Sequence, residues 1–213
     1  MSKSNNNFLD SVLEYSNTYW IVNVMELLER LAYYGVRAVI ALYMVLPREL
    51  GGPELTHKEK GMIFLWWAAF QSLLPMFTGG YADRYGHKKT IVVAILIKII
   101  GYIMMAQFQD FWGFFWGCMA LAIGTAIFKP GVQGTLALKL KNKNASLGWA
   151  IFYQIVNIGG FLGPVVAGLL RMLDWSYVFY NCAAIVALNF LWLPFYDDPS
   201  KDIEKTNETP FEV

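Results

Sequence analysis

Histidine and cysteine are scarce in this sequence, with two of each among 213 residues. Cys118 and Cys182 stand in apolar runs, and their spacing fits neither a metal site nor a disulfide framework. His57 and His87 lie far apart, near residues typical of loops. No nucleophile–base set and no nucleotide-binding loop accompanies them. We therefore expect no metal site, no catalytic residues and no bound cofactor, and hence a protein that is not an enzyme.

The sequence also lacks any block of like charge, because 17 basic and 16 acidic residues leave a net charge of only +1. A nucleic-acid partner is therefore not expected. The N-terminal stretch MSKSNNNFLDSVLEYS is polar and has no short apolar core followed by a cleavage site. We accordingly predict no signal peptide.

Apolar residues are abundant: they make up 56% of the chain, against roughly 45–50% in soluble proteins. Six segments are long enough to cross a hydrocarbon layer of ~30 Å, which takes about 20 apolar residues per helix. They are Asn17–Leu46, Lys60–Gly80, Thr90–Gln107, Phe111–Leu138, Ser146–Met172 and Tyr177–Tyr196. We predict an all-α integral membrane protein with six transmembrane helices over residues 17–196. A cytoplasmic tail over 1–16 precedes them, and a charged cytoplasmic tail or the start of a linker, over 197–213, follows.

Lysine and arginine are distributed unequally between the two sides of these six segments. One side holds nine of them: Lys3, Arg84, Lys88, Lys89, Lys139, Lys141, Lys143, Lys201 and Lys205. The other side holds four: Arg48, Lys58, Lys60 and Arg171. Because the richer side usually faces the cytoplasm, we expect a multi-pass protein of the cell membrane with both termini in the cytoplasm.

The first predicted span contains the charged stretch MELLERLAYYGVR, residues 25–37. A charge at a helix centre costs about 2.5–3.5 kcal/mol, so such residues face a bundle interior, a partner or a water-filled cavity. At ~100° per residue, the polar residues gather on one face: Asn23, Glu26, Glu29, Arg30, Tyr33, Tyr34 and Arg37. The opposite face is compatible with lipid and holds Leu28, Leu31, Ala32 and Val39.

Two interpretations of these charges stay open. Glu26 and Arg30 are spaced for an ion pair at i, i+4, which favours a structural salt bridge between helices. Arg37 has no carboxylate within one helical turn, which favours binding of an external anion.

Other polar residues lie within later spans. Lys129 precedes Pro130, which bends a helix, so the lysine either faces a cavity or extends toward the cytoplasmic surface. Lys98 is nearer the middle of its span, and because the sequence does not identify its partner we leave it outside the site. Asn157 is expected to hydrogen-bond in the interior. Small residues on the same span are expected to pack against another helix: Gly159, Gly163 and Ala167.

The connection between the second and third spans, GGYADRYGHKKT, resembles the G-x-L-A-D-R-x-G-R-K signature of the major facilitator superfamily. Tyr81 and His87 replace the usual leucine and arginine, and the matching residues are Gly79, Asp83, Arg84, Gly86 and Lys88. We expect Gly79 and Gly86 to let the chain turn tightly. The resemblance implies that this loop stabilises one gate of a transport cycle; a topology signal alone is the alternative.

Three further motifs resemble those of the proton-coupled oligopeptide transporters, a family within that superfamily. ELLERLAYYGVR is similar to E-x-x-E-R-F-x-Y-Y-G-x-R, with Leu31 in place of phenylalanine. GTAIFKPGV, around Lys129, resembles the family's lysine motif of the fourth helix. FYQIVNIGG is similar to F-Y-x-x-I-N-x-G-S, with Val156 and Gly160 departing. The resemblance covers most of the membrane part and corresponds to the amino-terminal six-helix half.

The resemblance implies symport of protons with di- and tripeptides by alternating access, with the proton as coupling ion and no cofactor. It implies that Glu26, Glu29 and Arg30 couple proton binding to gating. Arg37 and Lys129 would hold the peptide carboxylate, and the other residues lining the pocket would be Tyr33, Tyr34 and Asn157.

Such transporters bind substrate between two six-helix halves. The expected partners are therefore a small peptide, the lipid bilayer and a second six-helix half that is missing from this chain. Two alternatives remain: a truncated or non-transporting membrane remnant or scaffold, and a transporter of another small anionic nutrient.

Overall fold

The computed structural model describes residues 8–140 and 144–199, and every regular element within these ranges is a helix. A short helix, α1 (Phe8–Leu13), precedes the six that build the bundle. These are α2 (Asn17–Tyr43), α3 (His57–Tyr85), α4 (His87–Gln107), α5 (Phe111–Lys139), α6 (Ala145–Leu170) and α7 (Trp175–Ala187). Three short 3-10 helices follow α2 or α7: Arg48–Leu50, Leu188–Leu191 and Leu193–Phe195. Each of the six predicted segments overlaps one bundle helix, and the last also includes the two 3-10 helices after α7. This confirms the all-α class.

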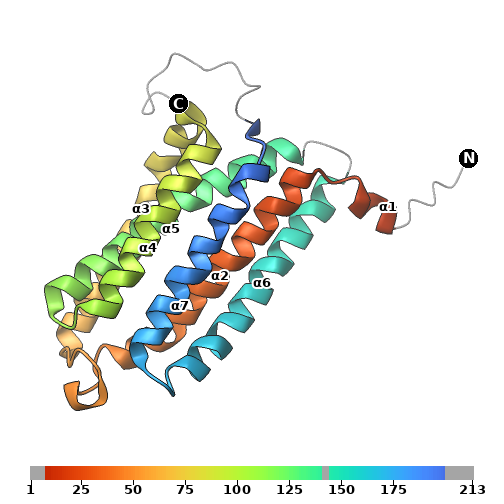
Figure 1. The fold of residues 1–213 in the computed structure, drawn as a ribbon. Helices are drawn as coiled ribbons and strands as arrows, with labels where there is room; N and C mark the ends of the chain where they lie inside the picture. The colour runs from red at the N-terminus through yellow and green to blue at the C-terminus, as the bar shows by residue number, and fades with distance from the viewer. Residues whose placement is uncertain (1–7, 141–143, 200–213) are drawn as a thin grey trace, which may run out of the picture.

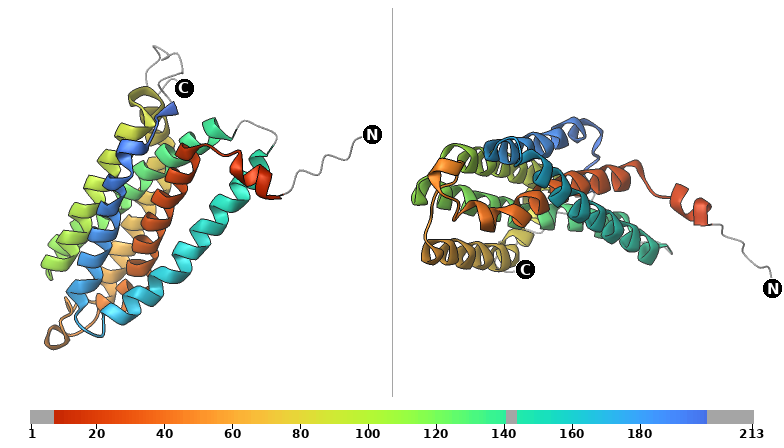
Figure 2. Two further views of the ribbon diagram at one scale, coloured as in Figure 1. Left: turned by 45° about the vertical axis from the view of Figure 1, so that its right-hand side comes forward. Right: turned by 90° about the horizontal axis from the view of Figure 1, so that it is seen from below.

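The six helices run side by side with alternating direction (Figures 1 and 2). α4 packs against α5 and α7, α2 packs against α6 and α7, and α3 lies mainly against α5. Of the long apolar helices, α3 and α6 are the least buried. They therefore form the flanks of the bundle, whereas α2 and α5 carry most of their side chains into the interior.

Contacts between loops show which connections share an end of the bundle. Tyr15 Oη donates to Asn144 O at 2.8 Å, and Lys88 Nζ donates to Tyr196 O at 3.1 Å. One end of the bundle therefore holds the α3–α4 turn, the α5–α6 connection and both described ends of the chain (Figure 1). At the other end, the connections after α2 and α4 are joined by the side chain of Gln109. Five predicted loop cations lie outside the described residues: Lys3, Lys141, Lys143, Lys201 and Lys205.

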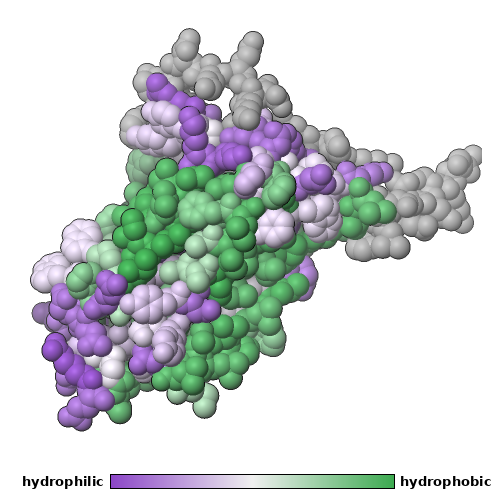
Figure 3. Space-filling model, in the orientation of Figure 1, coloured by the Kyte–Doolittle hydropathy of each residue, from purple (hydrophilic) through white to green (hydrophobic). Residues whose placement is uncertain are grey.

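In the part of the chain that the structure describes, five helices are long and apolar enough to cross a membrane: α3, α4, α5, α6 and the segment Trp175–Phe195 that contains α7. Figure 3 shows a broad apolar surface between two polar ends on one face of the molecule. α2 is 27 residues long but is not among the five, because any 18-residue stretch of it contains Glu26, Glu29 and Arg30.

Polar side chains begin most of these helices. Ser16 Oγ accepts from the backbone N–H of Tyr19 at 3.2 Å at the start of α2. α3 begins with a reciprocal capping box between Thr56 and Glu59. Asp110 Oδ2 accepts from Gly113 N at 2.8 Å at the start of α5. These caps satisfy backbone donors that have no partner within the helix, and so fix where each helix begins.

The predicted small-residue ridge of α6 packs against α2. A Cβ on Gly163 would lie 2.4 Å from Leu31 O and 2.7 Å from Gly35 N, so the two backbones are almost in contact. A Cβ on Gly159 would lie 2.8 Å from the Cβ of Arg30. Glycine is therefore required for the close approach of the two helices at this point.

The α2 face that was predicted to meet lipid lies partly inside the bundle. Ala32 has no exposed surface and Val39 is buried. Cys182 Sγ on α7 donates to Ala32 O at 3.4 Å. The prediction is wrong at these two residues because α7 covers this side of α2, which sequence periodicity alone does not show.

The predicted loop between the second and third spans is much shorter in the structure. α3 continues to Tyr85 and α4 begins at His87, which leaves Gly86 as the single residue between them. Gly86 has φ +96°, so the expected tight turn is confirmed there. Gly79 lies inside α3, and a Cβ on it would meet no atom within 4 Å. The expected turn at Gly79 is wrong, because α3 continues through it.

Candidate functional site

Four buried charges lie between α2 and α4. Arg30 Nε is 3.1 Å from Glu26 Oε1, and Arg30 also pairs with Glu29. Lys98 Nζ contacts the other carboxylate oxygen of Glu29. None of the four side chains is more than 7% exposed. We call Glu26, Glu29, Arg30 and Lys98 the charge cluster; its two carboxylates and two cations balance, as burial of charges requires.

Lys98 was left outside the predicted site, yet it supplies the second cation of the charge cluster. A Cβ on Gly124 of α5 would lie 2.4 Å from Lys98 Cγ, so the lysine occupies space that this glycine leaves free. The sequence signal for it is weak: Glu26, Glu29 and Arg30 leave one negative charge, which Arg37 of the same stretch or a lysine of another helix could balance. The sequence does not say which cation does so, because the pairing crosses from α2 to α4.

Two predicted pocket residues pack directly on Arg30. The guanidinium carbon of Arg30 lies 5.1 Å from the ring centroid of Tyr33 and 5.8 Å from that of Tyr34. Tyr33 Oη also donates to Gln71 Oε1 on α3 at 2.9 Å. The Tyr34 ring faces Gly160 of α6, where a Cβ would lie 3.4 Å from it. The tyrosines therefore connect the charge cluster to both flanking helices.

Arg37 lies about two helical turns further along α2 and is exposed. Its guanidinium carbon is 4.6 Å from the ring centroid of Phe64 and 5.1 Å from that of Trp67, both on α3. No carboxylate of the described residues forms an ion pair with it. The aromatic rings position the cation by cation–π contact and leave its charge uncompensated.

The two remaining predicted pocket residues come from other helices. Lys129 on α5 is half-buried and interacts electrostatically with Glu26 and Arg30. Within the described residues it has no ion-pair partner. Asn157 on α6 is exposed, and no hydrogen bond among the described residues joins it to the charge cluster. The structure thus brings Lys129 close to the charge cluster and shows Asn157 on an open face of α6.

The predicted gating residues are divided between the end of α3 and the start of α4. Asp83 Oδ1 lies 3.5 Å from His87 Nε2, one turn further on. On its other side, His87 Nδ1 is 3.8 Å from Asp198 Oδ1. The backbone N–H of Lys88 donates to Asp198 Oδ2 at 2.9 Å, and Lys88 Nζ donates to Tyr196 O. This motif therefore joins α3, α4 and the segment after α7.

Asp198 was not predicted to contribute to this contact, because it lies in the segment interpreted as a charged tail. It is 6% exposed and caps α4 through Lys88. Residues 200–213 of that predicted tail lie outside the described residues. No local pattern distinguishes Asp198 from its neighbour Asp197, whose side chain is 70% exposed.

Comparison with known proteins gives one family. Residues 27–212 match the Major Facilitator Superfamily. Dipeptide and tripeptide permease A of Proteus mirabilis is 31% identical over 151 residues, which are 68% of this chain and 29% of that relative. Permease A of Escherichia coli is 26% identical over 166 residues, 76% of this chain and 32% of the relative. The chain spans about a third of the length of these relatives.

Solved structures show the same fold. A crystal structure of a peptide transporter, POT, has a TM-score of 0.75 and 25% identity, over 83% of this chain and 37% of that one. A POT family transporter in complex with 5-aminolevulinic acid has a TM-score of 0.76 and 23% identity, over 84% and 37% of the two chains. The predicted resemblance to oligopeptide transporters is confirmed, and the apolar helices are those of a membrane protein. The chain belongs to the major facilitator superfamily.

Proposed function

We propose that this chain is the amino-terminal half of a proton-coupled symporter of di- and tripeptides. In this proposal α2 also crosses the membrane, as the first of six spans. Both termini lie in the cytoplasm of a multi-pass protein of the cell membrane. A second six-helix half completes the substrate cavity, and transport proceeds by alternating access. The named peptide permeases among the relatives support the substrate class.

One observation carries the proposal: two cations within the helices have no ion-pair partner among the described residues. Glu26 and Glu29 are neutralised by Arg30 and Lys98 inside the charge cluster. Arg37 and Lys129 remain as two further cations of α2 and α5, with no ion-pair partner among the described residues. Cations within membrane helices are costly unless they meet an anion, and a peptide carboxylate supplies one through charge-assisted hydrogen bonds.

The same arrangement supplies a coupling route. Lys129 interacts electrostatically with Glu26, and this attraction stabilises the ionised carboxylate. A peptide carboxylate bound at Lys129 would neutralise it, so Glu26 would lose that stabilisation and take up a proton more readily. Arg30 would then be free to strengthen its pair with Glu29. Tyr33, Tyr34 and Asn157 line the pocket in this scheme.

The motif around the α3–α4 turn serves as one gate in this proposal. Gly86 sets the turn, and Lys88 ties the start of α4 to the segment after α7. Asp83 and Arg84 lie on the last turns of α3, where they are exposed and available to contact the second half. Gly79 belongs to the same motif.

The decisive experiment measures uptake of a labelled dipeptide into vesicles under an inward proton gradient. The chain is reconstituted alone and together with a complementary carboxy-terminal half from a peptide permease. We expect uptake with both halves, and we expect Arg37→Ala and Lys129→Ala to abolish it. Arg171→Ala, at the far end of α6, is the control and should leave uptake intact.

A second measurement tests the carboxylate assignment without transport. The assembled halves should bind a dipeptide but not its C-terminal amide, because the amide offers no charge to Arg37 and Lys129. Equal binding of both ligands would show that these cations do not hold the carboxylate. Absence of uptake with and without the complementary half would reject the transporter proposal for this chain.

A further inference from the structure

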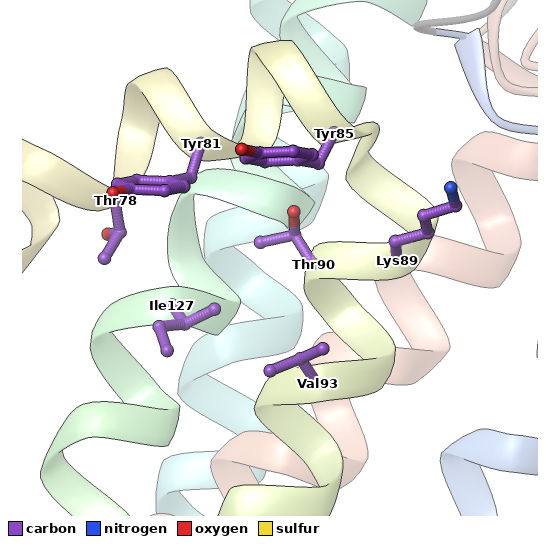
Figure 4. Close-up of a pocket in the computed structure, with 7 residues that line it drawn as sticks. All are labelled: Thr78, Tyr81, Tyr85, Lys89, Thr90, Val93 and Ile127. Atoms are coloured by element: carbon purple, nitrogen blue, oxygen red, sulfur yellow. The ribbon is translucent and has the colours of Figure 1, made fainter. Parts of the chain in front are cut away.

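A pocket unrelated to the charge cluster lies between α3 and α4, near the turn that joins them (Figure 4). Its volume is about 480 Å³, within the usual range of roughly 300–1,000 Å³ for small-molecule sites. Tyr81 and Tyr85 form one wall, with ring centroids 5.8 Å apart and planes inclined by 18°. Val93 of α4 and Ile127 of α5 lie on the other side (Figure 4).

The pocket has an apolar interior although two threonines line it. Thr78 Oγ1 donates its proton to Ala126 O at 3.1 Å. Thr90 Oγ1 donates to Gly86 O at 3.0 Å. Both hydroxyl protons are therefore used within the protein. A polar solute would find few donors in this space, whereas a hydrocarbon chain would meet mainly apolar surface on the protein side.

Cations stand at the rim of the same pocket. Lys89 lines it and is exposed, and no ion pair with a described residue compensates its charge. Arg84 packs on the tyrosine wall, with its guanidinium carbon 5.8 Å from the Tyr85 ring centroid. Lys88, by contrast, is already bound to Tyr196 O. Lys89 is thus an uncompensated cation at the rim of an apolar pocket.

The position of the pocket adds a third observation. α3, which lines one side of it, also carries exposed apolar residues such as Met76 and Phe77. The pocket also lies at the last turns of α3, beside the polar end of the bundle. Tyrosine pairs and snorkelling lysines are typical of this depth in a bilayer, where hydrocarbon gives way to charged headgroups.

The geometry points to a binding site for an anionic phospholipid in this pocket. One acyl chain lies between the tyrosine wall and Val93, and the phosphate contacts Lys89. A bound lipid would brace the end of α3 against α4 next to the proposed gate. The ligand is a bilayer lipid and not free phosphate, because the apolar volume is the larger part of the site.

The test is native mass spectrometry of the purified full chain with added phosphatidylglycerol or phosphatidylcholine that carry the same acyl chains. We expect preferential retention of phosphatidylglycerol. Lys89→Gln should lower that preference about fivefold, the usual effect of one basic residue on anionic lipid. Lys58→Gln, an exposed lysine at the opposite end of the bundle, should leave the preference unchanged.

A filling variant tests the acyl-chain part separately. Val93→Trp occupies the pocket and should reduce retention of both lipids severalfold. The matched control is Val165→Trp on α6, because Val165 is 48% exposed, as Val93 is, but lies outside the pocket. Helix content measured by circular dichroism confirms that each variant is folded, and Lys89→Gln provides the charge test independently of the filling variants.

Several results would overturn the inference. The unaltered chain could retain the two lipids equally, or Lys58→Gln could lose as much preference for phosphatidylglycerol as Lys89→Gln. Val93→Trp could retain both lipids as well as the unaltered chain does, or soluble glycerol 3-phosphate could displace the lipid. A Lys89-dependent dimer in place of a lipid adduct would also reject it. No peptide or proton gradient is used, so failure here leaves the proposed transport function untouched.

Discussion

Lys98 of α4 forms an ion pair with Glu29 of α2, and neither side chain has any exposed surface. Arg30 pairs with the same glutamate, so Glu29 is shared between two helices. Loss of one member of a buried pair leaves an uncompensated charge, which is far more costly than replacement of both members by neutral side chains. The pair therefore fixes how α2 and α4 pack.

This pair gives the first prediction. Lys98→Met should lower the free energy of unfolding by about 3–5 kcal/mol, because Glu29 loses one partner in the interior. The double variant Lys98→Met, Glu29→Gln should recover a large part of that loss. Thermal unfolding of the purified chain and its two single variants completes the double-mutant cycle. Additive losses would show that the two residues do not interact energetically.

The second prediction concerns proton coupling. Glu26→Gln keeps the size and polarity of the side chain but removes the group that would take up the proton. With the complementary half present, peptide exchange without a gradient should continue, while uptake driven by a proton gradient should cease. Glu49→Gln, in an exposed turn after α2, is the control. Gradient-driven uptake that persists in Glu26→Gln would remove Glu26 from the coupling scheme.

The third prediction tests the contact between α2 and α6. Gly163→Ala would place a methyl group 2.4 Å from Leu31 O, so α6 must move away, at a cost of about 1–3 kcal/mol. Gly168→Ala on the same helix meets no atom within 4 Å and should stabilise α6 by roughly 0.5–1 kcal/mol. The midpoint temperature of thermal unfolding should therefore fall in Gly163→Ala and rise in Gly168→Ala. A shift of the same sign in both would contradict the packing described.

The fourth prediction concerns pH and the start of α7. The hydroxyl and the backbone N–H of Ser176 donate to Asp174 Oδ1, and these hydrogen bonds hold the pKa of that carboxyl below its ordinary value. A carboxyl with a lowered folded-state pKa adds stability above its unfolded pKa, and this stability disappears as the pH falls through the folded value. The contribution should therefore be present at pH 7 and decline below about pH 4.

Asp174→Ala checks this prediction. It removes an N-cap and should cost ~1 kcal/mol at pH 7. The difference in midpoint temperature of thermal unfolding between the original chain and the variant should shrink as the pH is lowered from about 5 to about 3. Glu49→Gln, whose side chain caps no helix, is the matched comparison. A difference that stays constant across this range would show that the Asp174 carboxylate does not stabilise the start of α7 through its charge.

The class of structure and the family followed from local patterns. Long apolar runs separated by breakers such as Gly86 predict helices without knowledge of their packing, because helix length and hydrophobicity are properties of one segment. The motif around Glu26 and Arg30 predicted an i, i+4 ion pair for the same reason, and that pair is present. Helix boundaries were less certain, since α3 runs five residues beyond the predicted Gly80 to Tyr85.

Contacts between distant segments could not be predicted in this way. Nothing in the sequence identifies Lys98 as the partner of Glu29. Nor does it show that Asp198, and not its neighbour Asp197, caps α4. Likewise, periodicity distinguishes the two faces of α2 but does not show that α7 covers Ala32.

The sequence by itself thus determined the helices, their order and the family motifs, because each depends on residues close together along the chain. Only the tertiary structure decided which charges neutralise one another. The energy of a buried charge depends on what surrounds it in space, so the distinction between the neutral charge cluster and the uncompensated cations Arg37 and Lys129 exists only once α2, α4 and α5 are packed together.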